Sequence, residues 1–308
     1  MLDGDSPIMM VDCEFGNKWG VDLRKISWVA LLFMLPGMAL ADDAVADNAK
    51  LTLAVRRIGL EWSRTDVKNA AEYQKSPVSA LKADSQTFVK GVFDTALEYS
   101  KNRFQWDNSL FMEYGETKLQ PYDEPETVSE NADDILLSSD LSYACWESSG
   151  FKFGPTVRAA YDTEFKTADD TPRQQVVRGS AGISLFDNAI VKSLYLTGVY
   201  EYDFTFANEE TSKLAAEVGW RLEYQIREGV KLSSNGYYRE YLSYSRFVPT
   251  DLERDLSAVL RLDTNLWGDL TMGPYVQYRR ARARGVDVYG SNFIMGISFN
   301  YITSFGLI

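Results

Sequence analysis

Hydrophobic and polar residues alternate along most of the chain. The stretch GFKFGPTVRAAYDTEF, residues 150–165, carries mainly apolar side chains on one set of alternate positions. The other set carries charge at Lys152, Arg158, Asp162 and Glu164. A period of two is that of a β-strand whose two faces meet different surroundings. The same alternation predicts strands at residues 88–100, 103–118, 133–147, 150–165, 174–187, 190–206, 213–227, 230–245, 253–266, 269–284 and 291–305.

Residues 51–62 fit either a strand or a helix. Leu51, Val55, Ile58 and Trp62 would share one helical face, whereas Ile58, Leu60 and Trp62 alternate as in a strand. We favour a strand, because the other segments need one more partner to close an even-numbered sheet. A helix remains the alternative for this segment.

The links between these segments alternate between short and long. The short links are residues 101–102, 148–149, 188–189, 228–229 and 267–268. The longer ones are residues 63–86, 119–132, 166–173, 207–212, 246–252 and 285–290. Short periplasmic turns and longer outer loops are typical of outer-membrane barrels. Trp106, Trp146 and Trp267 lie near short turns, as in an interfacial aromatic belt.

The predicted fold class is therefore all-β. We expect a membrane-spanning, antiparallel, up-and-down β-barrel of about 12 strands. The segments also exceed the roughly nine to eleven residues that a spanning strand needs. The alternative is a soluble β-sandwich, in which the two faces would meet a core and solvent instead.

The N-terminal residues resemble an export signal. Arg24 and Lys25 precede the uncharged run ISWVALLFMLPGMALA, which ends in a small-x-small site at Ala41. This layout predicts a secretory signal peptide cleaved after Ala41. We therefore expect residues 1–41 to be an N-terminal extension with a signal peptide, and residues 42–308 to form a barrel in the bacterial outer membrane.

Composition narrows the chemistry. The chain has 44 acidic and 32 basic residues, a net charge of −12, and no histidine. An acidic balance disfavours nucleic acid as a partner. The lack of histidine removes Ser-His-Asp catalysis and imidazole metal ligands. We expect no enzymatic activity, no cofactor and no metal, with an outer-membrane hydrolase only as a third candidate after the two barrel functions below.

Two acidic pairs are candidate calcium ligands. They are Asp133-Asp134 and Asp169-Asp170, both in predicted outer loops. Neither belongs to a ligand loop of defined spacing, so solvated acidic loops are the favoured interpretation.

The last predicted strand contains Gly296-Ile-Ser-Phe299-Asn-Tyr301. This sequence resembles the terminal signal of bacterial outer-membrane barrels, a glycine followed at +3 and +5 by large apolar or aromatic residues. The resemblance implies recognition by the barrel assembly machinery through Gly296, Phe299 and Tyr301. It departs from the usual form because ITSFGLI follows.

A second resemblance covers three segments, FQWDNSLFMEYGETK (104–118), ENADDILLSSDLSY (130–143) and AAYDTEF (159–165). They resemble an uncharacterised family of proteobacterial and Bacteroidetes outer-membrane proteins, with W-x-N-S-L…Y-G, then D-D, then T-E-F. The resemblance extends loosely over most of residues 42–308. That family has no assigned activity, so the resemblance implies the fold and not a function.

Alternation also predicts which charged residues face the barrel lumen. The pore-lining candidates are Lys152, Arg158, Arg178, Arg221, Arg239, Arg261, Arg279, Asp94, Glu98, Asp107, Glu113, Asp162 and Glu164. Most of the arginines belong to later strands and many acids to earlier ones. Opposite charged walls could select solutes by a transverse field. Alternatively, the same charges pair with one another and fill the lumen. Barrels of about eight strands have a filled interior and those of about sixteen to eighteen an open channel, and twelve strands are intermediate.

Two functions remain open at this point. One is a narrow, porin-like channel or transporter for small solutes. The alternative is a non-conducting structural or surface-interaction barrel that acts through its outer loops. The sequence also leaves open whether residues 63–86 fold into the lumen as a plug.

Overall fold

The structure is a computed structural model. It describes residues 49–76, 78–82, 87–119, 127–148, 150–167, 172–207 and 209–308. The predicted signal peptide and the pair Asp169-Asp170 lie outside these residues. Among the helices of the described residues, none is long and apolar enough to cross a membrane.

Strands make up most of the described chain. They are β1 (Lys50–Lys68), β2 (Thr87–Lys101), β3 (Phe104–Leu119), β4 (Thr127–Tyr143), β5 (Trp146–Ser148), β6 (Phe151–Thr163), β7 (Gln175–Phe186), β8 (Val191–Asp203), β9 (Thr211–Arg227), β10 (Val230–Tyr244), β11 (Leu252–Trp267), β12 (Leu270–Ala283) and β13 (Gly290–Gly306). A 3₁₀ turn, η2 (Ala70–Tyr73), and one helical turn, α2 (Ser79–Lys82), lie between β1 and β2.

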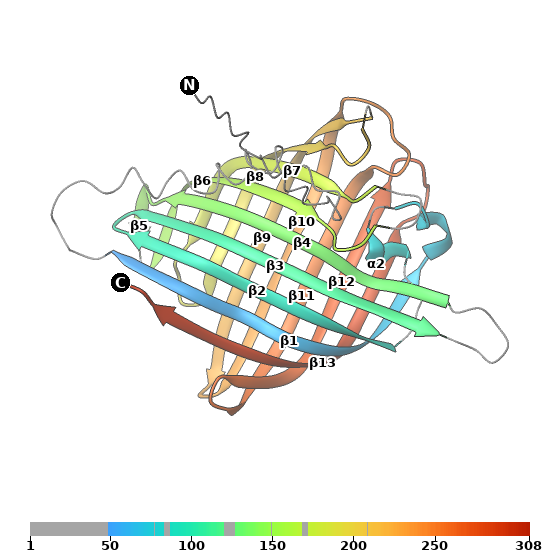
Figure 1. The fold of residues 1–308 in the computed structure, drawn as a ribbon. Helices are drawn as coiled ribbons and strands as arrows, with labels where there is room; N and C mark the ends of the chain where they lie inside the picture. Colours follow the sequence, from blue (N-terminus) through green and yellow to red (C-terminus); the bar gives the residue numbers. More distant parts are fainter. Residues whose placement is uncertain are drawn as a thin grey trace, which may run out of the picture. The chain divides into compact units, whose positions relative to one another are not determined.

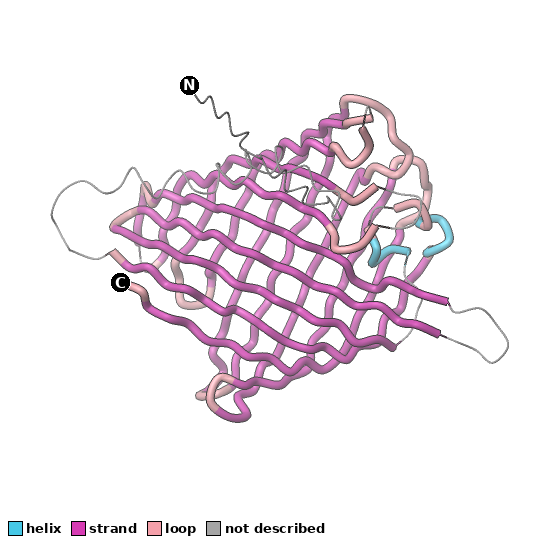
Figure 2. The backbone as a smooth tube through the Cα atoms, viewed as in Figure 1, coloured by secondary structure: helices cyan, strands magenta, loops and turns pink. Residues whose placement is uncertain are grey.

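Twelve long strands close into an antiparallel barrel. Consecutive long strands pair, β13 returns to β1, and β4 pairs with β6 beside the short β5. Figures 1 and 2 show the resulting cylinder of tilted strands. Among the described residues, closure gives each of the twelve long strands a neighbour on both sides, which is what a hydrocarbon environment demands of backbone polar groups. The predicted up-and-down barrel is confirmed, and the sandwich alternative is excluded.

Residues 51–62 form a strand, as favoured from the sequence. β1 pairs with β2 on one side and with β13 on the other. Both ladders shift register next to Val55, which marks a β-bulge. A bulge sends two successive side chains to one face, and the side chains of Arg56 and Arg57 both bind interior carboxylates.

Glycine-proline pairs interrupt the ladders in two different ways. The break opposite Gly154-Pro155 lies in the neighbouring strand, where Ala144 and Cys145 separate β4 from β5. At Gly273-Pro274 the ladder with β13 continues without a shift, so this pair causes no bulge there. Proline lacks an N–H, and the β11 ladder accommodates it by leaving these two residues unpaired.

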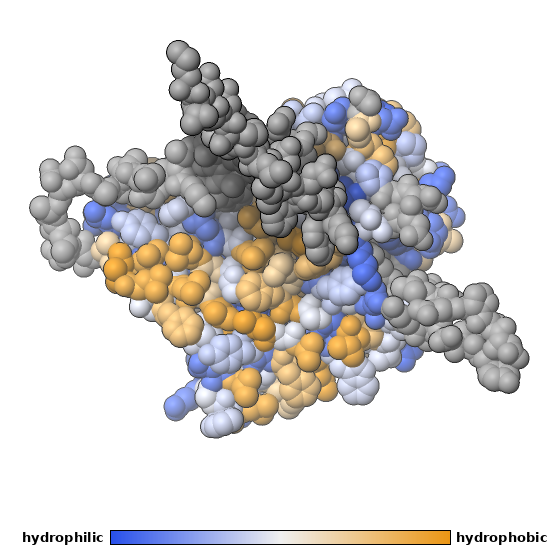
Figure 3. Space-filling view, viewed as in Figure 1, coloured by the Kyte–Doolittle hydropathy of each residue, from blue (hydrophilic) through white to orange (hydrophobic). Residues whose placement is uncertain are grey.

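The outer surface of the barrel is apolar and its interior is polar. Leu60 is 62% exposed on the outside, whereas the next residue, Glu61, is 1% exposed on the inside. Figure 3 shows hydrophobic residues gathered across the face that carries β1, β2, β3 and β13. Trp146 and Trp267 are exposed at the short-turn end. This distribution of polar and apolar side chains is the reverse of that in a soluble protein. Together with closure of the strands, it identifies a membrane-spanning barrel of the outer-membrane type.

The longer connections gather at one end of the barrel. In Figure 1, α2 lies at this end and the C-terminus lies at the other, near the start of β1. We call them the loop end and the turn end. Even strand number places both barrel termini at the turn end, as in barrels whose short turns are periplasmic.

Candidate functional site: an ion-paired lumen and its vestibule

The structure places the predicted pore-lining residues on the interior face. Twelve of the thirteen lie on strands, at positions that alternate with lipid-facing side chains, and Glu164 follows β6 at the mouth. Most of them contact a charge of opposite sign, and these pairs form three layers along the barrel.

The layer towards the turn end contains a pair that crosses the lumen. Arg221 on β9 places a guanidinium nitrogen 3.4 Å from a carboxylate oxygen of Asp107 on β3. β3 and β9 are separated by four long strands in one direction and six in the other, so this contact joins nearly opposite walls. Asp107 also binds Arg56, which contacts Glu98 at 2.8 Å.

The middle layer is centred on Glu61. Its carboxylate lies 2.6 Å from Arg57, 2.9 Å from Arg261 and 3.3 Å from Lys90. The Lys90 ammonium, itself 2% exposed, also binds Glu113 at 2.7 Å. Glu61, Lys90 and Arg261 are nearly inaccessible to water. Each has a partner, because an unpaired ion would be very costly there.

The layer towards the loop end is centred on Glu201 of β8. It binds Arg178 at 2.7 Å, Lys213 at 3.0 Å and the hydroxyl of Tyr241 at 2.9 Å. Two further pairs complete this layer, Arg239 with Glu217 at 2.5 Å and Arg279 with Asp255 at 2.8 Å.

Three further ion pairs of the candidates join adjacent strands, or a strand and its turn. Arg178 binds Asp162, Arg158 binds Asp140, and Lys152 binds Asp187 in a short turn. In the Arg178 and Arg158 pairs, as in Arg239–Glu217 and Arg279–Asp255, an arginine meets a carboxylate on an adjacent strand. This is the pairing weighed in the sequence as the alternative to two walls of opposite charge.

A cavity of about 770 Å³ occupies the interior between these layers and the loop end. We call it the vestibule. It reaches down to Glu113, Arg158 and Gln277 at mid-barrel and up to loop residues such as Thr250. Among the described residues that line it, eleven are Asp or Glu and seven are Lys or Arg. Tyr195, Tyr237 and Tyr241 add hydroxyl groups and ring faces.

Part of the loop between β1 and β2 folds into the mouth of the barrel. Tyr73 and Leu81 are nearly inaccessible and pack with Leu252, Ala281 and Ala283 of the inner wall. The Tyr73 hydroxyl lies 2.9 Å from the carbonyl oxygen of Val288 and 3.1 Å from that of Ala281. This inward loop, residues 69–76 and 78–82, lines the vestibule and presents Lys75 and Lys82 to it.

Other contacts hold the mouth together. The carboxylate of Asp133 accepts hydrogen bonds from the backbone N–H groups of Phe165 at 2.7 Å and Lys166 at 2.9 Å. Asp133 therefore anchors a loop, rather than standing as a solvated acid. Among the described residues, no group of three acidic or cysteine side chains is arranged to hold a metal ion.

Asp251 links another loop to the wall. Its carboxylate lies 2.7 Å from the ammonium of Lys213. Burial raises the pKa of Asp251 above its usual value, and the attraction of Lys213 only partly opposes this shift.

Several interior residues were not among the sequence candidates. They include Arg56, Arg57, Glu61 and Lys213. The first three lie in the segment whose strand and helix patterns competed, and the bulge breaks the alternation there. Two consecutive arginines within the mainly apolar stretch LTLAVRRIGL (residues 51–60) were the available signal.

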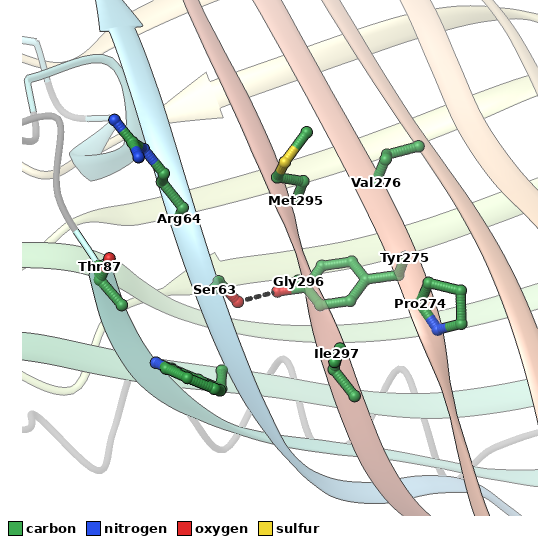
Figure 4. A pocket seen from close by; sticks show the side chains of 10 residues that line it. Ser63, Arg64, Thr87, Pro274, Tyr275, Val276, Met295, Gly296 and Ile297 are labelled. Atoms are coloured by element: carbon green, nitrogen blue, oxygen red, sulfur yellow. Dashed lines mark hydrogen bonds between the residues drawn. The ribbon is translucent and has the colours of Figure 1, made fainter.

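A crevice on the lipid-facing surface lies over Gly296. Pro274, Val276, Met295 and Ile297 surround it, and the Tyr275 hydroxyl bonds to that of Ser63 (Figure 4). A Cβ atom at Gly296 would lie 2.4 Å from the carbonyl oxygen of Trp62 and 2.9 Å from Oγ of Ser63. This glycine of the terminal motif thus allows β1 and β13 to approach closely.

Comparison with known proteins adds one family. Residues 82–168 match the profile of a family described as "Protein of unknown function (DUF3078)". The resemblance to a family of unknown function is confirmed over this segment, which is shorter than the stretch expected from the sequence. It contains the W-x-N-S-L…Y-G, D-D and T-E-F motifs, and Asp133 of the second motif bonds to Phe165 of the third. Among curated proteins, no sequence match is found.

Solved structures with a similar arrangement are outer-membrane proteins. An outer membrane channel from Pseudomonas putida F1 is 11% identical, with 86% of this chain and 98% of that chain covered and a TM-score of 0.41. Outer membrane phospholipase A from Escherichia coli is 11% identical, with 85% and 95% covered and a TM-score of 0.43. The outer membrane channel DcaP of Acinetobacter baumannii is 9% identical, with 86% and 100% covered and a TM-score of 0.41. The fold assignment rests on the strand pairing and surface polarity described above.

Proposed function

We propose that this protein is an outer-membrane channel that admits small solutes into the vestibule and passes them through a narrow, ion-paired constriction. The observation that carries the proposal is the vestibule, a charged cavity that runs from the loop end to mid-barrel. A structural barrel has no need of such a volume lined by both signs of charge. Charged linings of this kind replace part of a solute's hydration shell.

The constriction has a pair that can open at low cost. Asp107 is shared by Arg56 and Arg221, so release of Arg221 leaves the carboxylate with a cation. The Arg221 side chain is 31% exposed and can be hydrated when it is released. A buried ion that loses its only partner is costly. Asp107 avoids this cost because it keeps Arg56 when Arg221 is released.

Export and assembly belong to the same proposal. We infer that residues 1–41 direct export, and that Gly296, Phe299 and Tyr301 are read by the assembly machinery. The outward exposure of Phe299 and Tyr301 on the last strand supports this role.

The second candidate is a non-conducting barrel that acts through its outer loops. The observation in its favour is the middle layer, where Glu61 and Lys90 are almost completely buried. A lumen sealed at that layer would leave the vestibule as a binding cavity that opens only to the outside.

Single-channel recording of the folded barrel in a planar bilayer separates the two. We expect small, discrete conductance steps for the unchanged protein, and larger steps for Arg221→Gln, because the crossing pair is removed. Lys231→Gln is the matched control, since Lys231 pairs with Glu223 on the neighbouring strand at 3.7 Å and bridges no opposite wall. A silent bilayer for all three proteins, with heat-dependent gel mobility showing that they are folded, would favour the non-conducting barrel.

A further inference from the structure

A group of basic and aromatic residues lies on the outside of the barrel at the loop end. It consists of Arg254 on β11, Arg280 and Arg282 on β12, Tyr289 in the following loop and Glu240 on β10. We call it the rim cluster. Arg254 and Arg282 face each other in the ladder near the end of both strands. Arg280 is exposed. A lipid-facing arginine is costly at the bilayer centre and tolerated near the interface, so this position places the cluster at headgroup level.

Tyr289 organises the three arginines. Its hydroxyl accepts a hydrogen bond from Arg254 at 2.9 Å. Its ring centre lies 4.2 Å from the Arg280 guanidinium and 5.9 Å from that of Arg282. Cation–π contact and the hydrogen bond hold three long side chains around one ring, which reduces the entropy lost when they bind a common ligand.

The arginines of the rim cluster outnumber the carboxylates that pair with them. Glu240 binds Nε of Arg254 at 2.9 Å, and Glu253 lies 3.4 Å from Nε of Arg282. No carboxylate of the described residues forms an ion pair with Arg280. Three cations therefore face two carboxylates, and each of these carboxylates meets only one edge of a guanidinium.

Directly below the cluster the outer surface becomes apolar. Leu256 of β11 lies opposite Arg280 in the ladder, and Tyr278 is the next outward residue of β12. A ligand that fits both zones has an anionic head and a hydrocarbon body. Arginine forks match phosphate oxygens in pairs, and tyrosines favour the headgroup level.

We propose that the rim cluster binds a phosphate group of an outer-leaflet lipid, whose acyl chains lie along the apolar wall beneath it. This is a binding site on the outside of the barrel and is independent of solute passage through the lumen. It would orient the barrel in the membrane and hold the outer ends of β10, β11 and β12 in a fixed arrangement.

Native mass spectrometry of the full-length folded protein tests the site. The probe is a phosphorylated outer-leaflet glycolipid, titrated into neutral detergent, with the same glycolipid stripped of its phosphates as the second arm. We expect the phosphorylated lipid to bind the triple variant R254Q/R280Q/R282Q about a hundredfold more weakly, because each arginine near a membrane surface contributes roughly a fivefold factor. The dephosphorylated lipid should bind both proteins equally weakly.

A charge-matched control is R103Q/K192Q/R227Q, which removes three positive charges at the turn end. It should bind the phosphorylated lipid as tightly as the unchanged protein. The proposal would be overturned if the rim variant bound the phosphorylated lipid as tightly as the unchanged protein does. It would also be overturned if the unchanged protein bound the dephosphorylated lipid as tightly as the phosphorylated one. Displacement of the lipid by inorganic phosphate at the lipid's own concentration would assign the cluster to free phosphate instead. Heat-dependent gel mobility confirms that each variant is folded.

Discussion

Individual charged side chains in this barrel lie where a partner can reach them. Glu61 has three cationic neighbours and Asp107 has two, although neither touches solvent freely. Low local dielectric makes an unpaired ion costly and a paired one strongly directional. Each pair therefore helps to fix which residues of distant strands face each other.

Asp133 illustrates a single side chain that orders a loop. In Asp133→Asn, one of the two backbone N–H groups of Phe165 and Lys166 loses its acceptor oxygen. An unmet, charge-assisted hydrogen bond costs about 2 kcal/mol, or roughly thirtyfold in a local opening equilibrium. We expect trypsin to cleave after Lys166 and Arg173 faster by this factor, as measured by mass spectrometry of the folded protein.

Asp287→Asn is the control for that experiment. It makes the same change in the exposed loop between β12 and β13. Cleavage after Lys166 should be unchanged in this variant. If Asp133→Asn also left cleavage unchanged, the loop would not depend on the Asp133 carboxylate.

The strands form a regular frame, and the inward loop is the element that modifies it. This loop buries Tyr73 and Leu81 against β11 and β12, although η2 and α2 are each only four residues long. Such short turns have little intrinsic stability. Packing against the inner wall is therefore what holds the loop in the mouth.

Truncation of one side chain should release this loop. Leu81→Ala removes a fully buried side chain and should cost about 3 kcal/mol of local stability. We expect faster tryptic cleavage after Lys75 and Lys82 and larger conductance steps, while heat-dependent gel mobility stays that of a folded barrel. Leu242→Ala, a lipid-facing residue that is 68% exposed, should change neither readout. Protected lysines in Leu81→Ala would show that other contacts hold the loop.

At the level of the complete barrel, the balance of vestibule charge should decide which ions enter. Carboxylates outnumber cations among the described lining residues. In a confined, weakly screened space, such an excess attracts cations and repels anions. The whole chain is acidic as well, with a net charge of −12.

Under a salt gradient, the reversal potential should therefore have the sign of cation preference. The triple variant D134N/E164Q/E209Q removes three lining carboxylates and should move the reversal potential towards zero. The control variant E240Q/E253Q/D287N removes three carboxylates outside the vestibule and should leave the reversal potential unchanged. An anion preference in the unchanged protein would contradict the assignment of the vestibule as the selective region.

Most of the fold could be predicted from the sequence because a strand's two faces follow a local rule. The alternation in residues 150–165 marks Arg158 and Asp162 as interior and Val157 as lipid-facing, and the structure agrees. Most strand limits agreed to within three residues, since charged and polar links end the apolar stripes. The exceptions are the end of β1, which runs six residues past Trp62, and the start of β4, which lies six residues before Asp133. The alternation of short and long links placed the two ends of the barrel.

The candidate site was less predictable because it joins residues that are distant in the sequence. Alternation identifies Arg221 and Asp107 as interior, but their contact across the lumen depends on the stagger and curvature of all the strands between them. The bulge at Val55 turned Arg56 and Arg57 to the same side, which a strict period of two could not show. The inward packing of Tyr73 also depends on a wall formed by strands near the C-terminus.

The amino-acid pattern thus determined the barrel, its two ends and the side of the wall on which most charges lie. Those properties are local, because each side chain points opposite to its neighbours along the strand. Closure of the cylinder determined which charges meet, how far the vestibule extends and where the rim cluster gathers. Those properties depend on register between strands, which the hydrophobic pattern specifies only as inside or outside.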